Sequence, residues 1–219
     1  MKRNQFALPN VYTYNLIIQS IYLSSKPLDP TRTDDENEIM SSSGTISKND
    51  ISKDALNFTV STVDKYLEIL TEMVKTKTKK TSPNVYTYNL ILKGLSNLAI
   101  QGNGSESVNE YIIQNCMDIF LDMKRKPNIR PDVVTYSTIM RILYLTALHS
   151  KCAKTTKTIN VIMELYRQYK LSFANSSNKV IDSIVMNTLS LLIGRGDADA
   201  TSTALLLVKE LNTPETDGK

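Results

Sequence analysis

The stretch Pro83-Asn84-Val85-Tyr86-Thr87-Tyr88-Asn89-Leu90-Ile91 is the clearest signal in this sequence, because it occurs more than once. The same nine residues stand at 9–17, a looser copy (PDVVTYSTI) stands at 131–139, and a faint fourth copy (DSIVMNTL) stands at 182–189. A unit that recurs along a chain is typical of a repeat architecture, in which each unit packs mainly against its neighbours. The sequence therefore predicts a stack of similar units.

Helical periodicity follows each copy. Large apolar residues recur three, four and seven positions after the tyrosine of each clear copy, which places them on one face of an α-helix. Proline followed by Asn or Asp precedes these helices and is typical of a helix N-terminus. The predicted inward residues are Tyr14, Ile17, Ile18 and Ile21, then Tyr88, Ile91, Leu92 and Leu95, then Tyr136, Ile139, Met140 and Leu143, and last Met186, Leu189, Ser190 and Ile193.

A second amphipathic helix follows the first in each unit, and no strand pattern is visible. We predict an all-α fold, a helical-hairpin solenoid (α-α superhelix) of about three to four repeats. The predicted helix pairs are 11–24 with 56–75, 85–98 with 108–126, 133–148 with 153–169, and 184–193 with 198–211.

The predicted units differ in length because of the segments between their helices. Residues 26–55 lack periodicity, hold four basic and seven acidic residues, and are predicted to be a disordered insertion. The predicted boundaries are 11–84 for repeat 1 with this insertion, 85–132 for repeat 2, 133–182 for repeat 3 and 183–215 for a degenerate repeat 4. Residues 1–10 resemble the end of a missing preceding repeat, which predicts that the chain is an excerpt of a longer array.

The charge balance allows a phosphate-bearing partner without demanding one. The 26 basic and 22 acidic residues give a net charge of +4, and outside 26–55 the balance is 22 basic against 15 acidic. Basic runs occur at Lys75–Lys80 and at Lys124–Lys126, where solvated helix ends and phosphate contacts are both open interpretations.

Other function classes lack their sequence signals. The two cysteines, Cys116 and Cys152, have neither metal-binding spacing nor a disulfide framework, and a reducing compartment is the mild inference. No apolar run approaches the roughly 18–20 residues that span a bilayer, so no membrane span is predicted. Phosphate loops, dinucleotide fingerprints and nucleophile elbows are also absent. We therefore predict no catalytic residue, no metal and no cofactor.

The repeated residues resemble the pentatricopeptide repeat family. The carriers of this resemblance are proline, Asn or Asp, then Val-x-Thr-Tyr-Asn-x-Leu-Ile, followed by a second helix that ends in Phe-x-x-Met. Residues 120–123 (FLDM) match that ending in full and 70–73 (LTEM) in part, and the resemblance covers nearly the whole chain outside 26–55. The intervals of 74 residues from Tyr14 to Tyr88 and 48 from Tyr88 to Tyr136 exceed the family's compact unit and are similar to those of its fungal mitochondrial members.

The resemblance implies single-stranded RNA binding at about one base per repeat. The implied base-contacting residues are the fifth of each first helix and the residue before the next first helix, and the second residue of each first helix would stack on bases. The base-contacting set is Asn15, Asn84, Asn89, Asp132, Ser137, Asp182 and Asn187, and the stacking set is Tyr12, Tyr86, Val134 and Ile184.

The spacing of these residues is consistent with that role. Tyr12 and Asn15 are three apart and share a helix face, and Asn15 is predicted to point about 100° away from the packed stripe that begins at Tyr14. By resemblance, Asn with Asn implies cytosine, Asn with Asp implies uracil, and Ser with Asp implies a purine. The implied core preference is 5′-(C/U)-U-(G/A)-3′.

The implied function is RNA maturation in mitochondria without a catalytic site of its own. The candidate processes are 5′-end processing of the small-subunit rRNA precursor, mRNA stabilisation and intron splicing. The candidate partners are a mitochondrial transcript or rRNA precursor and the mitochondrial small ribosomal subunit. Alternatives are a protein-binding scaffold of the tetratricopeptide kind, whose tryptophan-containing pattern is absent here, and a structural subunit of the mitochondrial ribosome. A nuclease is a third alternative, although the sequence lacks an acidic metal cluster.

Overall fold

The computed structural model describes residues 9–24, 48–76, 78, 80–101, 106–149, 154–173, 178–194, 202 and 205. These residues form helices and contain no strand, which confirms the all-α prediction. The helices are α1 (Val11–Ser24), α2 (Lys48–Lys75), α3 (Val85–Gln101), α4 (Glu106–Arg125), α5 (Val133–His149), α6 (Lys154–Ser172) and α7 (Lys179–Gly194). The predicted helix over 198–211 lies outside the described residues, except for two isolated positions.

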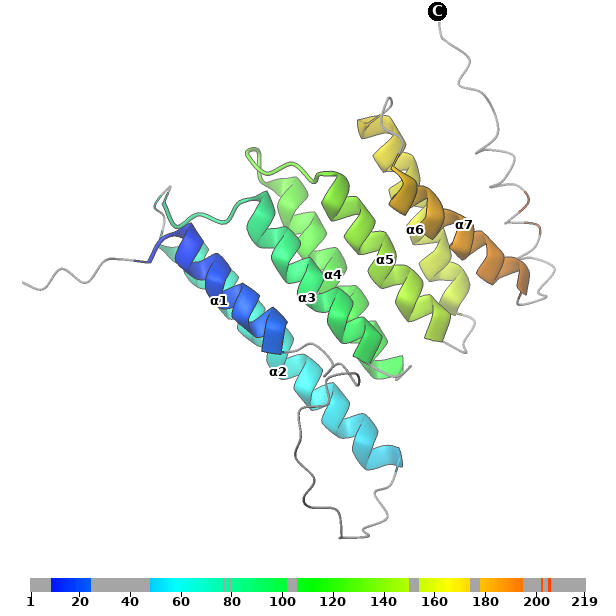
Figure 1. Cartoon of the computed structure of the whole chain (residues 1–219), viewed down its shortest axis with the longest axis horizontal. Coiled ribbons are helices and arrows are strands. Elements are labelled where there is room, and N and C mark those ends of the chain that lie inside the picture. Colours follow the sequence, from blue (N-terminus) through cyan, green and yellow to red (C-terminus); the bar gives the residue numbers. More distant parts are fainter. Residues whose placement is uncertain are drawn as a thin grey trace, which may run out of the picture.

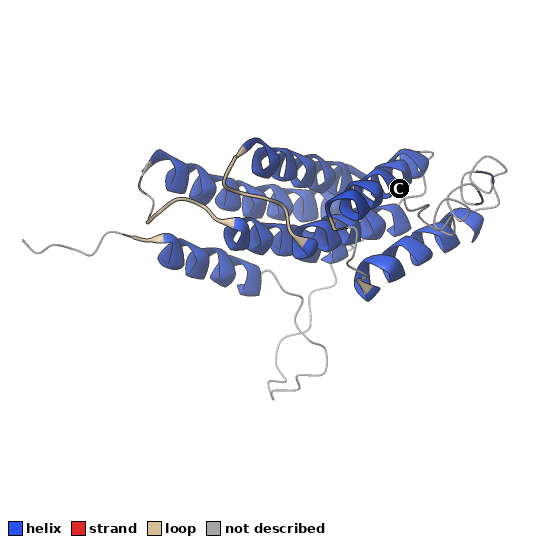
Figure 2. Ribbon diagram, turned by 90° about the horizontal axis from the view of Figure 1, so that it is seen from above, coloured by secondary structure: helices blue, strands red, loops and turns tan. Residues whose placement is uncertain are grey.

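The helices form two layers. The first helices of the units lie side by side in one layer, where α1 packs against α3, α3 against α5, and α5 against α7. The second helices α2, α4 and α6 lie behind them, each paired with the first helix that precedes or follows it in the chain (Figure 1). The view from above separates the two layers (Figure 2). Equivalent positions of α1, α3, α5 and α7 therefore recur across one face.

The packing between the layers uses most of the predicted apolar stripes. All four predicted residues of α3, from Tyr88 to Leu95, are buried, and so are all four of α5. In α1, however, Ile17 is 43% exposed, and in α2 the predicted Val74 is exposed while Tyr66 and Met73 are fully buried. Within the described residues, no helix combines the length and apolarity needed to cross a membrane.

Each clear copy of the repeated stretch begins with a reciprocal helix cap. The Thr87 amide donates to Asn84 Oδ1 at 2.9 Å, and the Asn84 amide donates to Thr87 Oγ1 at 3.2 Å. Asp132 and Thr135 exchange the same two bonds at 2.8 and 3.1 Å. These bonds satisfy amides that the first turn of a helix leaves without partners, as in a capping box. They explain why Thr stands three residues after Asn or Asp in each clear copy.

The start of α7 differs from the prediction. Asn178 Oδ1 accepts from the amides of Val180 and Ile181 at 3.0 and 3.3 Å, so α7 is capped at Asn178 and not at Asp182. The predicted start at 184 and the boundary between 182 and 183 are wrong, because both fall inside the helix. The apolar residues Ile181 and Ile184 face the core in this frame.

Two further consequences follow from the earlier start of α7. The predicted inward residues Met186, Ser190 and Ile193 are exposed, so only Leu189 of that predicted stripe is buried. The intervals between caps become 74, 48 and 46 residues, from Asn10 to Asn84, Asp132 and Asn178 in turn. The faint copy at 182–189 was therefore aligned four residues too late.

The predicted disordered insertion is wrong over 48–55, because α2 begins at Lys48. Extending an existing amphipathic helix adds one hydrogen bond per ordered residue, so a polar stretch can continue a helix that it could not nucleate. Leu56 already packs against the hydrophobic core at this end of α2. The rest of the predicted insertion, 26–47, lies outside the described residues.

In two of the hairpins, a tyrosine on the first helix donates a hydrogen bond to a carboxylate on the second helix. Tyr14 Oη donates to Glu72 Oε1 at 3.0 Å, and Tyr88 Oη donates to Asp122 Oδ2 at 2.6 Å. Glu72 and Asp122 are the third residues of the two matching second-helix endings, so the bond recurs with the unit. Burial and the neighbouring carboxylate raise the pKa of both tyrosines, which remain neutral donors at physiological pH.

Candidate nucleic-acid interface

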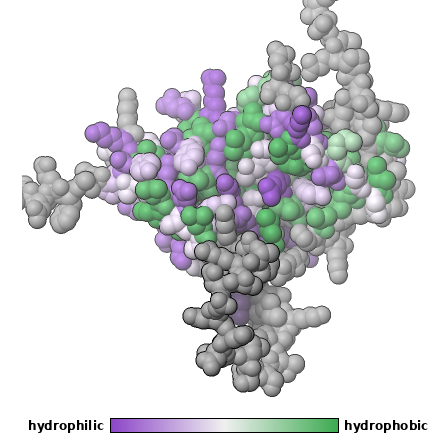
Figure 3. Space-filling view, in the orientation of Figure 1, coloured by the Kyte–Doolittle hydropathy of each residue, from purple (hydrophilic) through white to green (hydrophobic). Residues whose placement is uncertain are grey.

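Exposed apolar side chains recur at the second position of the first helices. Tyr12, Tyr86 and Val134 are 68%, 57% and 54% exposed, as expected for residues that stack on bases. The predicted fourth member, Ile184, is buried at 7%, because α7 begins at Lys179 and Ile184 is therefore its sixth residue and not its second. Val180 takes the equivalent place and is 58% exposed. On this face, hydrophobic and hydrophilic side chains are interspersed across the described surface (Figure 3).

The two predicted base-contacting residues of repeat 2 meet in the structure. Asn89 on α3 and Asp132 at the cap of α5 are 43 residues apart in sequence, yet Asn89 Nδ2 donates to Asp132 Oδ1 at 3.1 Å and Oδ2 at 3.3 Å. Thr135 Oγ1 lies 2.8 Å from Asn89 Oδ1 and 2.9 Å from Asp132 Oδ1. The packing of α3 against α5 therefore brings this pair together, three residues after Tyr86 on α3 and two residues before Val134 on α5.

This network fixes the orientation of the Asn89 amide. A carboxylate only accepts hydrogen bonds, so the amide nitrogen faces Asp132, and the amide oxygen faces the Thr135 hydroxyl. One N–H of Asn89 and one side of Asp132 Oδ2 keep free bonding capacity in this arrangement. Asn89 can therefore donate one hydrogen bond to the polar edge of a ring, and Asp132 can accept one from it.

The repeat 1 pair is arranged differently. Asn15 is buried, with 8% of its surface exposed, so the prediction that it points away from the packed side of α1 is wrong. Its Oδ1 atom has no hydrogen-bond partner among the described residues, whereas the equivalent atom of Asn89 faces Thr135. Asn84 is exposed and caps α3 through Thr87. A buried acceptor without a partner costs about 1–3 kcal/mol of folding free energy.

Two of the remaining predicted base-contacting residues stand at other positions than predicted. Ser137 is half-buried and donates to the Val134 carbonyl at 3.0 Å. Asp182 lies in the first turn of α7 and not before it, and Asn187 is exposed at the ninth helical position and not the fifth. The fifth position of α7 belongs to Ser183, and the residue before α7 is Asn178. The purine prediction for the third base therefore loses its basis.

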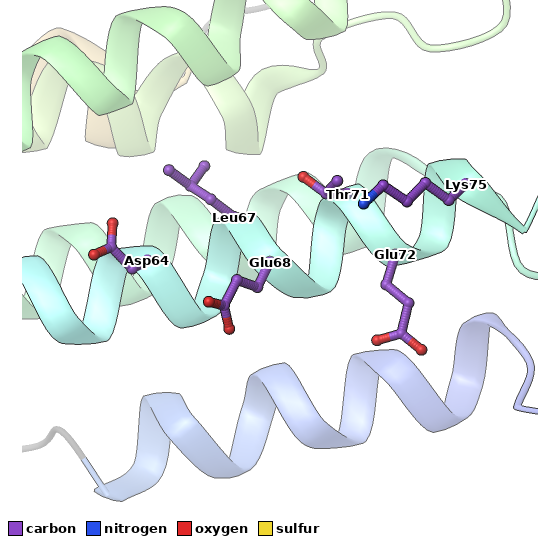
Figure 4. A pocket seen from close by; sticks show the side chains of 6 residues that line it. All are labelled: Asp64, Leu67, Glu68, Thr71, Glu72 and Lys75. Carbon is purple, nitrogen blue, oxygen red and sulfur yellow. The ribbon is translucent and has the colours of Figure 1, made fainter.

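A cavity in the layer of second helices is lined by more acidic than basic residues. The cavity has a volume of about 540 Å³, lies against α2 and is lined by Asp64, Glu68, Glu72 and Lys75 among others. Glu68 and Glu72 point toward α1 (Figure 4), and Glu72 accepts the Tyr14 hydroxyl. Three carboxylates against one ammonium disfavour a phosphate-bearing ligand, so the layer of first helices is the better candidate interface.

The described residues offer no arrangement for metal chemistry. They contain no group of three or more His, Cys, Asp or Glu side chains placed to hold a metal ion. Cys116 is fully buried in α4, and burial raises the pKa of its thiol, which keeps it protonated.

Comparison of the chain with protein-family models, with curated proteins and with solved structures gave no significant match.

Proposed function

We propose that the chain is a pentatricopeptide-type protein that binds single-stranded RNA along the layer formed by α1, α3, α5 and α7. The observation that carries the proposal is the contact between Asn89 and Asp132, together with the exposed side chains of Tyr86 and Val134. Recognition of an unpaired base requires hydrogen-bonding groups for its edge and side chains on which it can stack. The Asn89–Asp132 pair supplies the first, and Tyr86 and Val134 supply the second.

The mechanism is recognition without chemistry. Each base would stack against the exposed second-position side chains, which contributes about 1–3 kcal/mol per base. The Asn89–Asp132 pair would bond to the Watson–Crick edge of one base. Uracil presents an N3–H donor to the carboxylate and a carbonyl acceptor to the amide, so uracil suits this pair. Bound RNA would be masked from nucleases and from base pairing.

The cellular role follows from the family resemblance alone. We propose that the RNA is a mitochondrial transcript, and that binding serves 5′-end processing of the small-subunit rRNA precursor, mRNA stabilisation or intron splicing. Crosslinking the protein to RNA in organelles and sequencing the bound fragments would distinguish these roles.

A single isosteric substitution tests base recognition. Selection from randomised RNA should return uracil at one position for the wild-type chain and cytosine at that position for Asp132→Asn. The amide retains the cap on α5, but its N–H groups donate to the cytosine N3 acceptor. Asp182→Asn is the matched control, because Asp182 lies outside the pair, and it should leave the selected sequence unchanged. Selection of no position-specific base by the wild-type chain would overturn the proposal.

A protein-binding role is the second candidate, and a specific observation favours it. Leu16 and Ile17 of α1 are 48% and 43% exposed, whereas the equivalent Leu90 and Ile91 of α3 are buried. Neighbouring apolar side chains that are exposed on one helix suit a protein contact. Binding to a purified protein partner that survives ribonuclease and is lost in Leu16→Glu would support this candidate.

A further inference from the structure

We infer that a cavity beside Asp132 holds a backbone phosphate of the bound RNA, an inference that rests on the proposed function. The cavity has a volume of about 780 Å³ and lies where the α4–α5 turn meets the start of α5 and the end of α6. Its chemically distinctive lining residues are Lys124, Lys126, Arg130, Asp132, Tyr136 and Phe173.

One wall of the cavity is apolar and aromatic. Tyr136 and Phe173 meet edge to face with their ring centroids 6.2 Å apart, and Ile129 is buried beside them. Such a wall presents no hydrogen-bond acceptor that would repel a phosphate along most of its surface. Charges at its rim also interact more strongly across a low-dielectric wall than they do in open water.

Two cations at the rim lack a carboxylate partner. The exposed Arg130 side chain makes no hydrogen bond or ion pair with the residues that the structure describes. Lys124 Nζ bonds the neutral amide oxygen of Gln168 at 3.1 Å. Lys126, by contrast, pairs with Asp122 at 2.6 Å and is already neutralised. Lys124 and Arg130 are therefore the groups available to a phosphate.

The Asp132 carboxylate lines the same cavity and opposes an anion. Its Oδ1 atom, however, accepts from the Thr135 amide at 2.8 Å and from Asn89 Nδ2 at 3.1 Å, so donors surround this atom. The positive end of the α5 dipole also faces the cavity at Pro131 and Asp132. The planar guanidinium of Arg130 can donate two parallel hydrogen bonds to phosphate oxygens, and the single Asp132 carboxylate does not prevent this.

The position of Asp132 points to RNA phosphate as the occupant. Asp132 belongs both to this cavity and to the pair with Asn89, so a base on the pair leaves its own or the adjacent phosphate at the cavity mouth. The turn before α3 holds an exposed lysine, Lys80, four residues before the cap residue Asn84. The sugar–phosphate backbone would thus follow the edge where α3 and α5 begin.

Salt dependence tests the inference. The Arg130→Ala and Lys124→Ala variants are compared with Lys157→Ala, which removes an exposed lysine of α6 that does not line the cavity. Each cavity variant should bind its selected RNA about tenfold more weakly without changing the preferred bases. Its slope of log affinity against log salt should fall by about 0.7 for each lost contact with a single strand. Lys157→Ala should match the wild-type chain.

A modified RNA identifies the phosphate. Replacing one phosphodiester next to the selected uracil by an uncharged methylphosphonate should weaken binding of the wild-type chain but not of Arg130→Ala. Equal loss for both proteins, or a wild-type salt slope in Arg130→Ala, would overturn the phosphate site while leaving sequence-specific RNA binding intact. Absence of any RNA binding by the wild-type chain would overturn both proposals. Thermal unfolding of each variant verifies that it is folded.

Discussion

Tyr88 on α3 donates a 2.6 Å hydrogen bond to Asp122 on α4, and Lys126, the residue directly after α4, contacts both partners. The Lys126 ammonium also lies 5.1 Å from the centre of the Tyr88 ring. These three side chains form a polar cluster at the edge of the otherwise apolar contact between the two helix layers. The Tyr88 side chain is fully buried in that contact. The cluster joins the two helices of repeat 2 in the way that Tyr14 and Glu72 join those of repeat 1.

Removing the Tyr88 hydroxyl should destabilise the chain. Tyr88→Phe leaves the ring in place but deprives Asp122 of a donor, so the free energy of unfolding should fall by about 1–2 kcal/mol. Tyr111→Phe is the matched control, because the Tyr111 hydroxyl donates to Asp64 at the solvent-exposed surface at 3.2 Å. It should change the unfolding free energy by less than about 0.5 kcal/mol. Urea denaturation of the three proteins measures both effects, and equal losses would contradict this view.

The same carboxylate should make stability depend on acid pH. Burial alone would raise the pKa of Asp122, but hydrogen bonds from Lys126 and Tyr88 and the nearby positive charges lower it overall. A lowered pKa in the folded chain stabilises it above the unfolded pKa of about 3.9, and this contribution is lost as the pH falls through that region.

The comparison with Asp122→Asn isolates this contribution. The wild-type chain should be the more stable of the two at pH 7, and the gap should narrow between about pH 5 and pH 2. Because the Asp122 side chain is 41% exposed, solvent screening keeps the difference below about 1 kcal/mol. Denaturant titrations at a series of pH values give the gap, and a gap that widens on acidification would contradict the assigned bonds.

The glycine of α3 should not tolerate a methyl group. A Cβ atom at Gly94 would lie 2.6 Å from Cζ of Tyr66, a fully buried ring of α2. The close approach outweighs the roughly 1 kcal/mol by which Ala normally favours a helix, so Gly94→Ala should lose about 1–3 kcal/mol of stability. Gly194→Ala is the control, because nothing lies within 4 Å of its added Cβ. Its melting temperature should stay the same or rise slightly.

The two asparagines at the fifth helical position should respond in opposite ways to Leu. Asn15 is buried with an acceptor that lacks a partner among the described residues, so Asn15→Leu should leave stability unchanged or increase it. Asn89→Leu breaks the bonds to Asp132 and Thr135 and should lose about 1–3 kcal/mol. Thermal unfolding measures the contrast. Both variants should bind RNA more weakly if the proposed function holds.

Sequence patterns predicted those parts of the fold that depend on neighbouring residues. The caps at Asn84 and Asp132 and the stripes of α3 and α5 follow from helix geometry, which is local. The sequence does not reveal the start of α7, because the residues from Asp182 onward resemble the repeated stretch more than those from the cap residue Asn178 onward do.

The contacts between units were harder to predict. The bond between Asn89 and Asp132 and the burial of Asn15 depend on how α1, α3 and α5 pack, and spacing within one helix does not determine that packing. The tyrosine–carboxylate bonds had a signal that could have revealed them, since an acidic residue stands third in both second-helix endings.

The reciprocal caps have a consequence for how such a chain can change over generations. Each cap sets its exposed apolar residue two places on and its fifth-position polar residue five places on, as Asn84 does for Tyr86 and Asn89. The intervals from one cap to the next, 74, 48 and 46 residues, do not enter that spacing. Insertions and deletions between helices can therefore accumulate without changing the spacing of these residues within each unit.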